Sequence, residues 1–337
     1  VIGGGISGLA CAHDLKLKGY KAVVLERQAN PGGSARSERM GGFLMEHGPS
    51  TVNAASAAAN AFSHMLGLEA GRCDLGERVR RRYLVGGGAL QGISVRPWGF
   101  LLSGYLSLGG KLRLLREYSV AAAAGEVEET VAEFCQRRFG LEFLERVIDP
   151  LVAGIYAGRA DQLSVSAVFP KLVEMEREYG AVSPGLMRRR KRGVKMPSSR
   201  LFSWRGGVGA LPRALAAFLG GDVRSGVAVR RLTAVRGGFK VDAGRSGAFI
   251  AKSVVIATQP HVAAQLLDRI DADAAAAAAE IHAPPLAVVF FGFKRGQVDH
   301  PLDGLGFLAP EKEGRALNGA QFCSTMFPGR APDGHVS

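Results

Sequence analysis

Three glycines near the start of the chain have the spacing of a phosphate-binding turn. Gly3, Gly5 and Gly8 follow the pattern G-x-G-x-x-G between an apolar strand and a predicted helix that ends at Gly19. The first glycine permits a tight turn, the second lets the backbone approach a diphosphate, and the third lets the helix pack closely on the strand. Amide groups at the start of such a helix point towards the phosphates. The pattern therefore predicts a dinucleotide site.

A carboxylate follows at the distance that this chemistry requires. Residues 22–25 predict a buried strand ending in Glu26, which lies about 20 residues beyond the glycines, where an acid accepts hydrogen bonds from ribose hydroxyls. The same charge would repel the 2′-phosphate of NADP, so NADP is disfavoured. Strand, glycines, helix, second strand and acid occur in order, which predicts the βαβ unit of an α/β, Rossmann-like fold.

A second glycine turn lies just beyond the acid. Arg27 is followed by Pro31, Gly33, Ser34 and Arg36. A long cofactor lying along the edge of a sheet needs a second place where bare backbone can approach it. We therefore expect FAD rather than NAD.

A third turn contains His47, Gly48 and Pro49, and we expect it near the flavin ring. A catalytic base is one interpretation of His47, but neither a Ser nor a Cys partner is evident, so we expect a hydrogen-bonded turn histidine. The sequence names no catalytic residue. Its four cysteines are scattered without a C-x-x-C pair, which predicts neither a metal site nor a disulfide framework.

Length and composition limit the class of protein. A chain of 337 residues is expected to form two or three domains. A formal net charge of +13 favours acidic partners such as nucleotide phosphates, carboxylates or anionic lipid. Nucleic acid is disfavoured, because the basic residues lack interleaved aromatics for stacking. No apolar run reaches the roughly 18 to 20 residues that span a bilayer, so we expect neither a signal peptide nor a transmembrane helix, and any membrane contact would be peripheral.

Periodicity predicts the elements that carry these residues. Helical spacing covers residues 101–143, and helices are predicted over residues 210–219 and 274–279. A hairpin is predicted over residues 227–242 around a pair of glycines. Strands are predicted over residues 253–260, 286–293 and 304–308, and the first of these is expected to rejoin the nucleotide-binding sheet.

The middle of the chain resembles a known family. Residues 149–172 read DPLVAGIYAGRADQLSVSAVFPKL, which is similar to the G-[VI]-[YF]-A-G segment and the A-x-F-P-K-L pattern of the oxygen-dependent protoporphyrinogen oxidases, within the amine-oxidase-like flavoproteins. Three further stretches agree in the family's order, namely RRYLVGGGAL, LFSWRGGVGALPRAL and MFPGRAPDGH. The resemblance covers nearly the whole chain.

The resemblance implies three domains and a set of cofactor contacts. A Rossmann-like FAD-binding domain would contain residues 1–70 and 200–265, a mixed-sheet substrate domain residues 71–97 and 266–337, and a helical insertion, which touches the membrane in relatives, residues 98–199. With the third turn included, the expected FAD-binding residues are Gly3, Gly5, Ser7, Gly8, Glu26, Arg27, Gly33, Ser34, Arg36, Gly48, Pro49, Val229, Ala257 and Thr258.

The resemblance also implies three substrate-binding residues. Arg82 would hold a propionate group, as a planar cation can do with two hydrogen bonds. Gly154 would let backbone approach the tetrapyrrole, and Leu308 would pack against a pyrrole ring. Two positions depart from the family: Arg159 replaces the usual acid, and Gln321 stands where relatives place an apolar residue. The family's last strand and final glycine-rich FAD segment would follow Ser337, so we expect a C-terminally truncated chain.

The implied reaction is the oxidation of protoporphyrinogen IX to protoporphyrin IX, in heme and porphyrin biosynthesis. Hydride would pass to the flavin, and molecular oxygen would reoxidise it and give hydrogen peroxide. Oxidation of coproporphyrinogen III to coproporphyrin III is an alternative that the basic cluster at residues 78–82 would suit. Another amine-oxidase-like or carotenoid-type flavin oxidoreductase, and an inactive FAD-binding fragment, also stay open. We expect a cytoplasmic protein and leave open peripheral contact with the cytoplasmic membrane and a homodimer.

Overall fold

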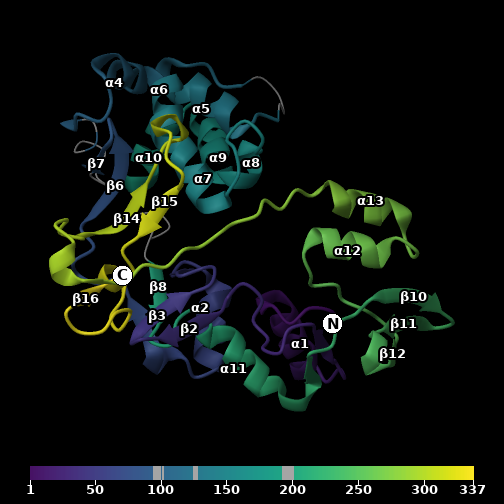
Figure 1. Cartoon of the computed structure of the whole chain (residues 1–337). Helices are drawn as coiled ribbons and strands as arrows, with labels where there is room; N and C mark the ends of the chain where they lie inside the picture. The colour runs from purple at the N-terminus through teal and green to yellow at the C-terminus, as the bar shows by residue number, and fades with distance from the viewer. Residues whose placement is uncertain (94–99, 101, 124–127, 192–200) are drawn as a thin grey trace. The chain divides into compact units, whose positions relative to one another are not determined.

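The computed structural model describes residues 1–93, 100, 102–123, 128–191 and 201–337 (Figure 1). These residues form two compact units, each built from separate stretches of the chain. The first unit contains Val1–Asp74, Ser199–Gly292 and Gly329–Pro332, and the second contains Leu75–Ser198, Phe293–Pro328 and Asp333–Ser337. The mixed α/β class is confirmed. The division into three domains stays a prediction.

The first unit begins with the predicted βαβ arrangement. Ile2 bridges in parallel to Leu25, and α1 (Ile6–Leu17) joins Ile2 to β1 (Val24–Glu26). β1 pairs in parallel with β9 (Val223–Ser225). Leu9 and Ala12 share a face of α1 and are fully buried in a core with residues of α11 (Ala210–Leu219). This apolar contact fixes the helix against the sheet.

The remaining elements of the first unit extend this core. An antiparallel hairpin consists of β2 (Ser37–Met40) and β3 (Phe43–Glu46), and a three-stranded sheet has the order β4 (Val52–Asn53), β8 (Leu201–Trp204) and β5 (Arg72–Asp74). A second three-stranded sheet contains β10 (Arg231–Val235), β11 (Gly238–Asp242) and β12 (Ala248–Ala251). The helices are α2 (Ala57–Met65), α12 (Pro260–Leu267) and α13 (Ala272–Glu280).

Two predicted strands differ from the structure. Residues 253–260 do rejoin the nucleotide-binding sheet, because Ile256 bridges in parallel to Ile2, but the pairing is a single bridge. Residues 286–292 form neither strand nor helix, and only Phe293–Lys294 pairs, as β13, with β16 (His335–Val336). None of the strands that the structure describes pairs with residues 286–292.

The second unit contains the mixed sheet that the sequence predicts. Its strand order is β15 (Gly319–Gln321), β14 (Gly304–Leu308), β6 (Arg81–Gly86) and β7 (Ala89–Ile93). β14 runs parallel to β6, whereas the two outer pairings are antiparallel. A short α14 (Cys323–Met326) follows the sheet.

The second unit also contains the β13–β16 pair and a group of helices that lies beside this sheet (Figure 1). The helices are α4 (Leu108–Leu115), α5 (Val131–Phe139), α6 (Leu141–Phe143), the π-helical η3 (Leu144–Ile148), α7 (Asp149–Tyr156), α8 (Val165–Val168), α9 (Pro170–Tyr179) and α10 (Val182–Lys191). Their core includes Val131, Phe134 and Val152, all fully buried. Among the described residues, no helix combines the length and apolar character needed to cross a bilayer.

Candidate functional site

The opening glycines form a tight, bare turn between Ile2 and α1. Gly3 has a φ of +104°, which residues with a side chain rarely adopt, and a Cβ added there would lie 2.5 Å from the carbonyl oxygen of Ala257. A Cβ on Gly8 would lie 2.0 Å from the Gly3 carbonyl oxygen, so α1 lies directly against the turn. Gly5 is the N-cap of α1, and no side chain caps that helix end. The backbone amides at the start of α1 therefore have no capping side chain.

Glu26 lies at the end of β1 and points its carboxylate towards this turn. The residue is 9% exposed. Its Oε2 accepts a hydrogen bond of 2.6 Å from the amide of Gly4, and its Oε1 accepts one of 2.7 Å from the amide of Gln28. Because each carboxylate oxygen can accept more than one hydrogen bond, both oxygens retain capacity for ribose hydroxyls.

The second glycine turn lies against the first. Gly5 and Gly32 form a parallel bridge, and the Gly32 amide donates a 2.8 Å hydrogen bond to the carbonyl of Gly4. Gly33 has a φ of +60°, and a Cβ there would lie 3.2 Å from the Cα of Gly5. Any side chain at these positions would fill the space between the two turns, so the glycines keep a continuous strip of bare backbone.

The third turn continues the same strip. A Cβ on Gly48 would lie 2.5 Å from the carbonyl oxygen of Ser34, so these two turns are in contact. The neighbouring His47 has both ring nitrogens engaged: Nδ1 lies 3.0 Å from Nη2 of Arg36, and Nε2 lies 2.8 Å from the carboxylate of Glu38. Because arginine only donates, Nδ1 accepts and Nε2 carries the proton. His47 is a hydrogen-bonded turn residue, and the geometry does not favour it as a base.

The remaining expected cofactor residues also lie in the first unit. The amide of Ala257 donates a 2.8 Å hydrogen bond to the carbonyl of Ile2, which places Ala257 and Thr258 beside Gly3. Val229 is half-buried in the core that contains Ile2. The residues with exposed side chains or backbone are Ser7, Arg27, Gly33, Ser34, Arg36 and Pro49.

These features fit FAD. The bare glycine strip matches a diphosphate that needs close backbone approach, and the buried acid at the end of β1 matches a ribose. The fit rests on the space that a Cβ would occupy at Gly3, Gly8 and Gly33 and on the direction of Glu26. Single-residue contacts with the cofactor stay predictions.

The expected substrate residues lie in the second unit, on elements that contact one another. Arg82 and Leu84 alternate with Tyr83 along β6, so they share one face of the sheet. Leu308 of β14 is paired with Leu84 in parallel register and lies on that same face. A Cβ on Gly154 of α7 would lie 2.5 Å from Cδ2 of Leu308. The three predicted positions therefore border one face of the mixed sheet.

The charge of Arg82 is available on this face. The residue is exposed, and its side chain makes no hydrogen bond or ion pair with any residue that the structure describes. The adjacent Arg81 points to the other face and lies 3.4 Å from the carboxylate of Asp303. Tyr83 donates a hydrogen bond to the same carboxylate and lowers the pKa of Asp303. Asp303 thus balances the charge of Arg81 and, within the described part of the chain, forms no ion pair with Arg82.

Of the two positions that depart from the family, Arg159 is paired with Asp161, and Gln321 lies on the same face of the sheet as Leu308. Arg159 forms hydrogen bonds of 2.9 and 3.0 Å with the carboxylate of Asp161. Both line a hollow of about 390 Å³ with Asp149, Glu311 and Lys312. Burial raises the pKa of Asp149. Gln321 lies in β15 opposite Gly306.

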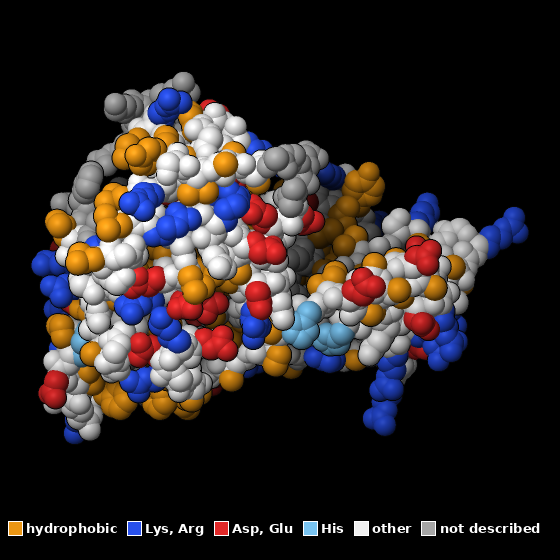
Figure 2. Space-filling model, turned by 90° about the horizontal axis from the view of Figure 1, so that it is seen from above, with side chains coloured by type: hydrophobic (Ala, Val, Ile, Leu, Met, Phe, Trp, Pro, Cys, Tyr) orange, Lys and Arg blue, Asp and Glu red, His pale blue; other side chains and the backbone are white. Residues whose placement is uncertain are grey.

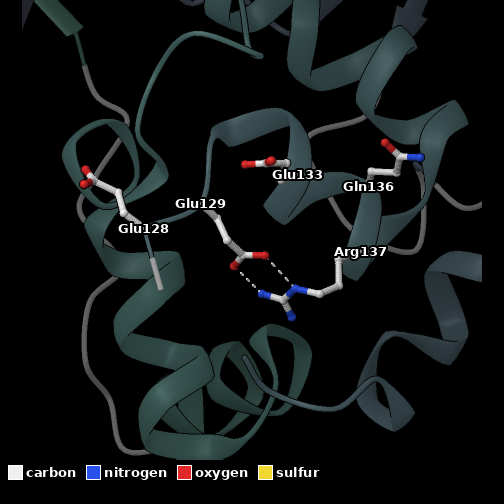
Figure 3. Close-up of a pocket in the computed structure, with 5 residues that line it drawn as sticks. All are labelled: Glu128, Glu129, Glu133, Gln136 and Arg137. Carbon is white, nitrogen blue, oxygen red and sulfur yellow. Dashed lines mark hydrogen bonds and ion pairs between the residues drawn. The ribbon is translucent and has the colours of Figure 1, made fainter. Parts of the chain in front are cut away.

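Another hollow lies in the helical part of the second unit (Figure 3). It has a volume of about 510 Å³ and is lined by Glu128, Glu129, Glu133, Gln136 and Arg137. The guanidinium of Arg137 donates two hydrogen bonds, of 2.5 and 2.8 Å, to the carboxylate of Glu129. This hollow contains none of the expected cofactor or substrate residues. Of its carboxylates, Glu129 is ion-paired with Arg137, and Glu133 caps the start of α5 by binding Thr130.

Sequence reasoning missed two residues that take part in this geometry. Gly4 supplies the amide that binds Glu26, and the run of three glycines at residues 3–5 was the available signal. Leu84 shares the face of Arg82 and Leu308, and its place two residues after Arg82 in a strand could have indicated this. On the face drawn in Figure 2, Lys and Arg side chains are interspersed with acidic and hydrophobic ones, so the net charge forms no single basic field there.

Comparison with known proteins places the chain in a family. The model of the family described as "Flavin containing amine oxidoreductase" matches residues 6–337. The chain is 30% identical to the mitochondrial protoporphyrinogen oxidase of Nicotiana tabacum, over 99% of this chain and 73% of that protein. It is 26% identical to the coproporphyrinogen III oxidase of Bacillus subtilis (strain 168), over 99% of this chain and 74% of that protein.

A solved structure shows the same fold. A protein of Exiguobacterium sp. 255-15, provisionally named protoporphyrinogen oxidase, matches with a TM-score of 0.81 and 21% identity, over 99% of this chain and 74% of that one. The turns built by Gly3, Gly5, Gly8 and Gly33 and the direction of Glu26 agree with the cofactor that the family's description implies. The chain therefore belongs to the flavin containing amine oxidoreductases and is an FAD-dependent oxidoreductase.

Proposed function

We propose that the protein oxidises protoporphyrinogen IX to protoporphyrin IX, with molecular oxygen as the electron acceptor. The observation that carries this proposal is the similarity of almost the whole chain to protoporphyrinogen oxidases, at 30% identity to the tobacco mitochondrial enzyme. The positions of Arg82 and Leu308 support it, because an unpaired cation and a half-buried aliphatic side chain lie on one face of the sheet. A flat, largely apolar macrocycle with propionate groups needs both.

The chemistry divides between cofactor and protein. FAD, when bound, accepts the two electrons that each oxidation step releases. The residues of this chain bind and orient the two molecules. The glycine strip from Gly3 to Gly48 and the carboxylate of Glu26 would hold the cofactor's diphosphate and ribose. No side chain is proposed as an acid or a base, since the pattern of the site calls for orientation rather than proton transfer.

Substrate orientation would come from the second unit. The guanidinium of Arg82 would bind a propionate with two hydrogen bonds. Leu308, which is half-buried, would contact the macrocycle, whereas Leu84 is buried in the core with Tyr105 and Leu106. Because Gly154 has no side chain, Leu308 can keep the position that it has in the structure.

Coproporphyrinogen III is the second candidate substrate. The relative in Bacillus subtilis is named coproporphyrinogen III oxidase and matches 99% of the chain, as does the tobacco mitochondrial relative. Coproporphyrinogen carries more propionates, and Arg78 and Arg80 place further exposed cations beside Arg82. A cluster of cations would suit additional carboxylates.

Turnover of both porphyrinogens by the purified protein with FAD tests the proposal. We expect protoporphyrinogen to give the higher kcat/KM, measured by the fluorescence of the porphyrin product under air. Arg82→Ala should raise KM by about tenfold to hundredfold, because a charged hydrogen bond contributes roughly 1.5 to 3 kcal/mol. Arg82→Lys should recover only part of the loss, since lysine lacks the planar fork.

Two results would contradict the proposal. A higher kcat/KM for coproporphyrinogen would support the second candidate. Turnover of neither porphyrinogen by a protein that carries FAD would require a different substrate class. Peripheral membrane contact and a homodimer stay predictions that these assays leave aside.

A further inference from the structure

A buried ion pair joins the third turn to a distant part of the chain. The side chains of Glu46 and Arg330 are 6% and 2% exposed and are separated by 284 residues in the sequence. Nη1 of Arg330 donates a 2.5 Å hydrogen bond to Oε1 of Glu46. Nη2 of the same guanidinium donates a 2.7 Å hydrogen bond to Oγ of Ser203, in β8. The pair therefore links the end of β3 to β8.

The carboxylate of Glu46 makes further contacts. Oε1 also accepts a 3.0 Å hydrogen bond from the amide of Val208. Oε2 accepts a hydrogen bond from the hydroxyl of Ser37, whose oxygen in turn accepts a 2.9 Å hydrogen bond from the amide of Gly209. A Cβ on Gly207 would lie 2.2 Å from Oγ of Ser37, so this backbone approaches the network closely. The Glu46 carboxylate thus connects the β2–β3 hairpin to the turn before α11.

Residues 329–332 are held on the same hairpin. The amide of Leu44 donates a 3.0 Å hydrogen bond to the carbonyl of Arg330. Arg39 donates a 3.3 Å hydrogen bond to the carbonyl of Gly329. These four residues belong to the first unit, although the chain on both sides of them belongs to the second. Arg330 is therefore fixed by its backbone as well as by its side chain.

The network directly precedes the cofactor strip. Glu46 is the last residue of β3, and His47 follows it with a 2.8 Å hydrogen bond from its amide to the carbonyl of Arg36. Gly48 then lies against the carbonyl oxygen of Ser34. A shift of Glu46 would be passed along the backbone to this turn, which lies against Ser34.

Stability alone does not account well for such a pair. Moving two charges out of water costs several kcal/mol per ion, and apolar replacements of similar volume are often as stable. We propose that Glu46, held by Arg330, is a positioning residue that sets the turn of residues 47–49 in its place for binding FAD. The inference rests on the proposed placement of FAD along the glycine strip. Glu46 acts through the turn and need not touch the cofactor.

Three variants of the full chain test this role. Glu46→Gln removes the charge that neutralises Arg330, and Ser203→Ala is a milder change that removes one hydrogen-bond partner of Arg330. Glu176→Gln is the matched control, because Glu176 is paired with buried Arg138 in the helical core of the second unit. The measurements are the Kd of the apoprotein for FAD, from the change in flavin fluorescence, the shape of the bound flavin's visible absorption, and the Tm of the apoprotein.

We expect the two kinds of variant to separate. Glu46→Gln should bind FAD about tenfold to hundredfold more weakly, as the loss of charged hydrogen bonds predicts. Its bound flavin should show an absorption band altered towards that of free FAD. Ser203→Ala should shift both readouts in the same direction by less. Glu176→Gln should lower Tm and leave both flavin readouts at wild-type values.

The outcomes distinguish this inference from the proposed function. An FAD Kd for Glu46→Gln equal to that of the wild type, with Tm lowered as in the control, would show a purely structural pair and overturn the inference alone. If Glu46→Gln does not fold, Ser203→Ala decides, and an unchanged Kd in that variant overturns the inference. A wild-type apoprotein that does not bind FAD would overturn the proposed function and this inference together.

Discussion

At Gly8, the surrounding atoms leave no space for a side chain. An alanine there would place its Cβ 2.0 Å from the carbonyl oxygen of Gly3 and 3.3 Å from the Cβ of Ala257. The first neighbour is backbone and cannot rotate away, so either α1 or the glycine turn must shift. Overpacking of this kind costs about 1 to 3 kcal/mol. The shift would also change the geometry of the amides at the start of α1.

Gly8→Ala should therefore reduce both stability and FAD binding. We expect a lower Tm in thermal unfolding and a purified protein that retains little flavin. Gly221→Ala is the control, because a Cβ there meets no atom within 4 Å and its φ is not in the positive region. Full flavin retention by Gly8→Ala would place the diphosphate away from this turn.

Residue identities in the first unit were predictable where chemistry fixes their spacing. The glycines and Glu26 are close in sequence, and a diphosphate and a ribose require them at set intervals. The network of Glu46 was not predictable in the same way. Its partner Arg330 lies 284 residues away, and a single arginine in a surface-like sequence gives no signal of burial. Only tertiary structure brings the two together.

At the scale of elements, the close contact between α7 and β14 limits the positions that the side chain of Leu308 can take. A Cβ on Gly154 would lie 2.5 Å from Cδ2 of Leu308, and this atom is the end of a flexible side chain. Leu308 can therefore rotate, at a cost of about 1 to 3 kcal/mol for the crowding. Replacing a helical glycine by alanine returns about 1 kcal/mol through helix propensity. The net effect on stability should be small.

Gly154→Ala should consequently change substrate binding more than folding. We expect a Tm lowered by only a few degrees and a KM for the porphyrinogen raised severalfold, because Leu308 would turn into the proposed substrate face. Gly104→Ala serves for comparison, since a Cβ there has open space around it. Steady-state kinetics and thermal unfolding of both variants provide the test. Equal KM values for Gly154→Ala and the wild type would argue against substrate contact at Leu308.

Elements with strong periodicity were predicted well. The helix over residues 210–219 and the strand over residues 304–308 occur with those bounds, since α11 buries Leu211, Leu215 and Leu219 on one face. The prediction of a strand over residues 286–293 was wrong, although the composition of this stretch is typical of a strand. Local composition supplies the propensity, but a strand also needs a neighbour for its backbone hydrogen bonds. No described strand is paired with residues 286–292.

At the scale of the whole molecule, each unit combines stretches that are far apart in sequence. Residues 329–332 complete the first unit, and residues 293–328 supply β14 to a sheet whose other central strand begins at Arg81. The apolar strand predicted over residues 253–260 already indicated a discontinuous cofactor domain, because it was expected to rejoin the nucleotide-binding sheet. Periodicity could not indicate that residues 329–332 also belong to the first unit, because that short stretch has no regular pattern of its own.

The buried charges of the helical core make this organisation sensitive to acid. Burial alone would raise the pKa of Glu176, but hydrogen bonds from Arg137 and Arg138 more than offset this, and the pKa is lowered. A carboxyl group with a lowered folded-state pKa contributes its full stability above the unfolded-state pKa of about 4.3 and loses it as the pH falls through the folded-state value. Arg138 is fully buried and would then lose a counter-charge.

We expect the free energy of unfolding, measured by urea denaturation between pH 7 and pH 3, to fall steeply below the ordinary pKa of Glu, which is about 4.3. Glu176→Gln should be less stable by about 3 kcal/mol at pH 7, because breaking a buried pair costs roughly 3 to 5 kcal/mol. That difference should shrink as the pH falls, since only the wild-type side chain takes up a proton. A constant difference between pH 7 and pH 3 would mean that Glu176 has the same pKa in the folded and unfolded states, and that other carboxylates, such as Asp303 beside Tyr83, account for the acid sensitivity.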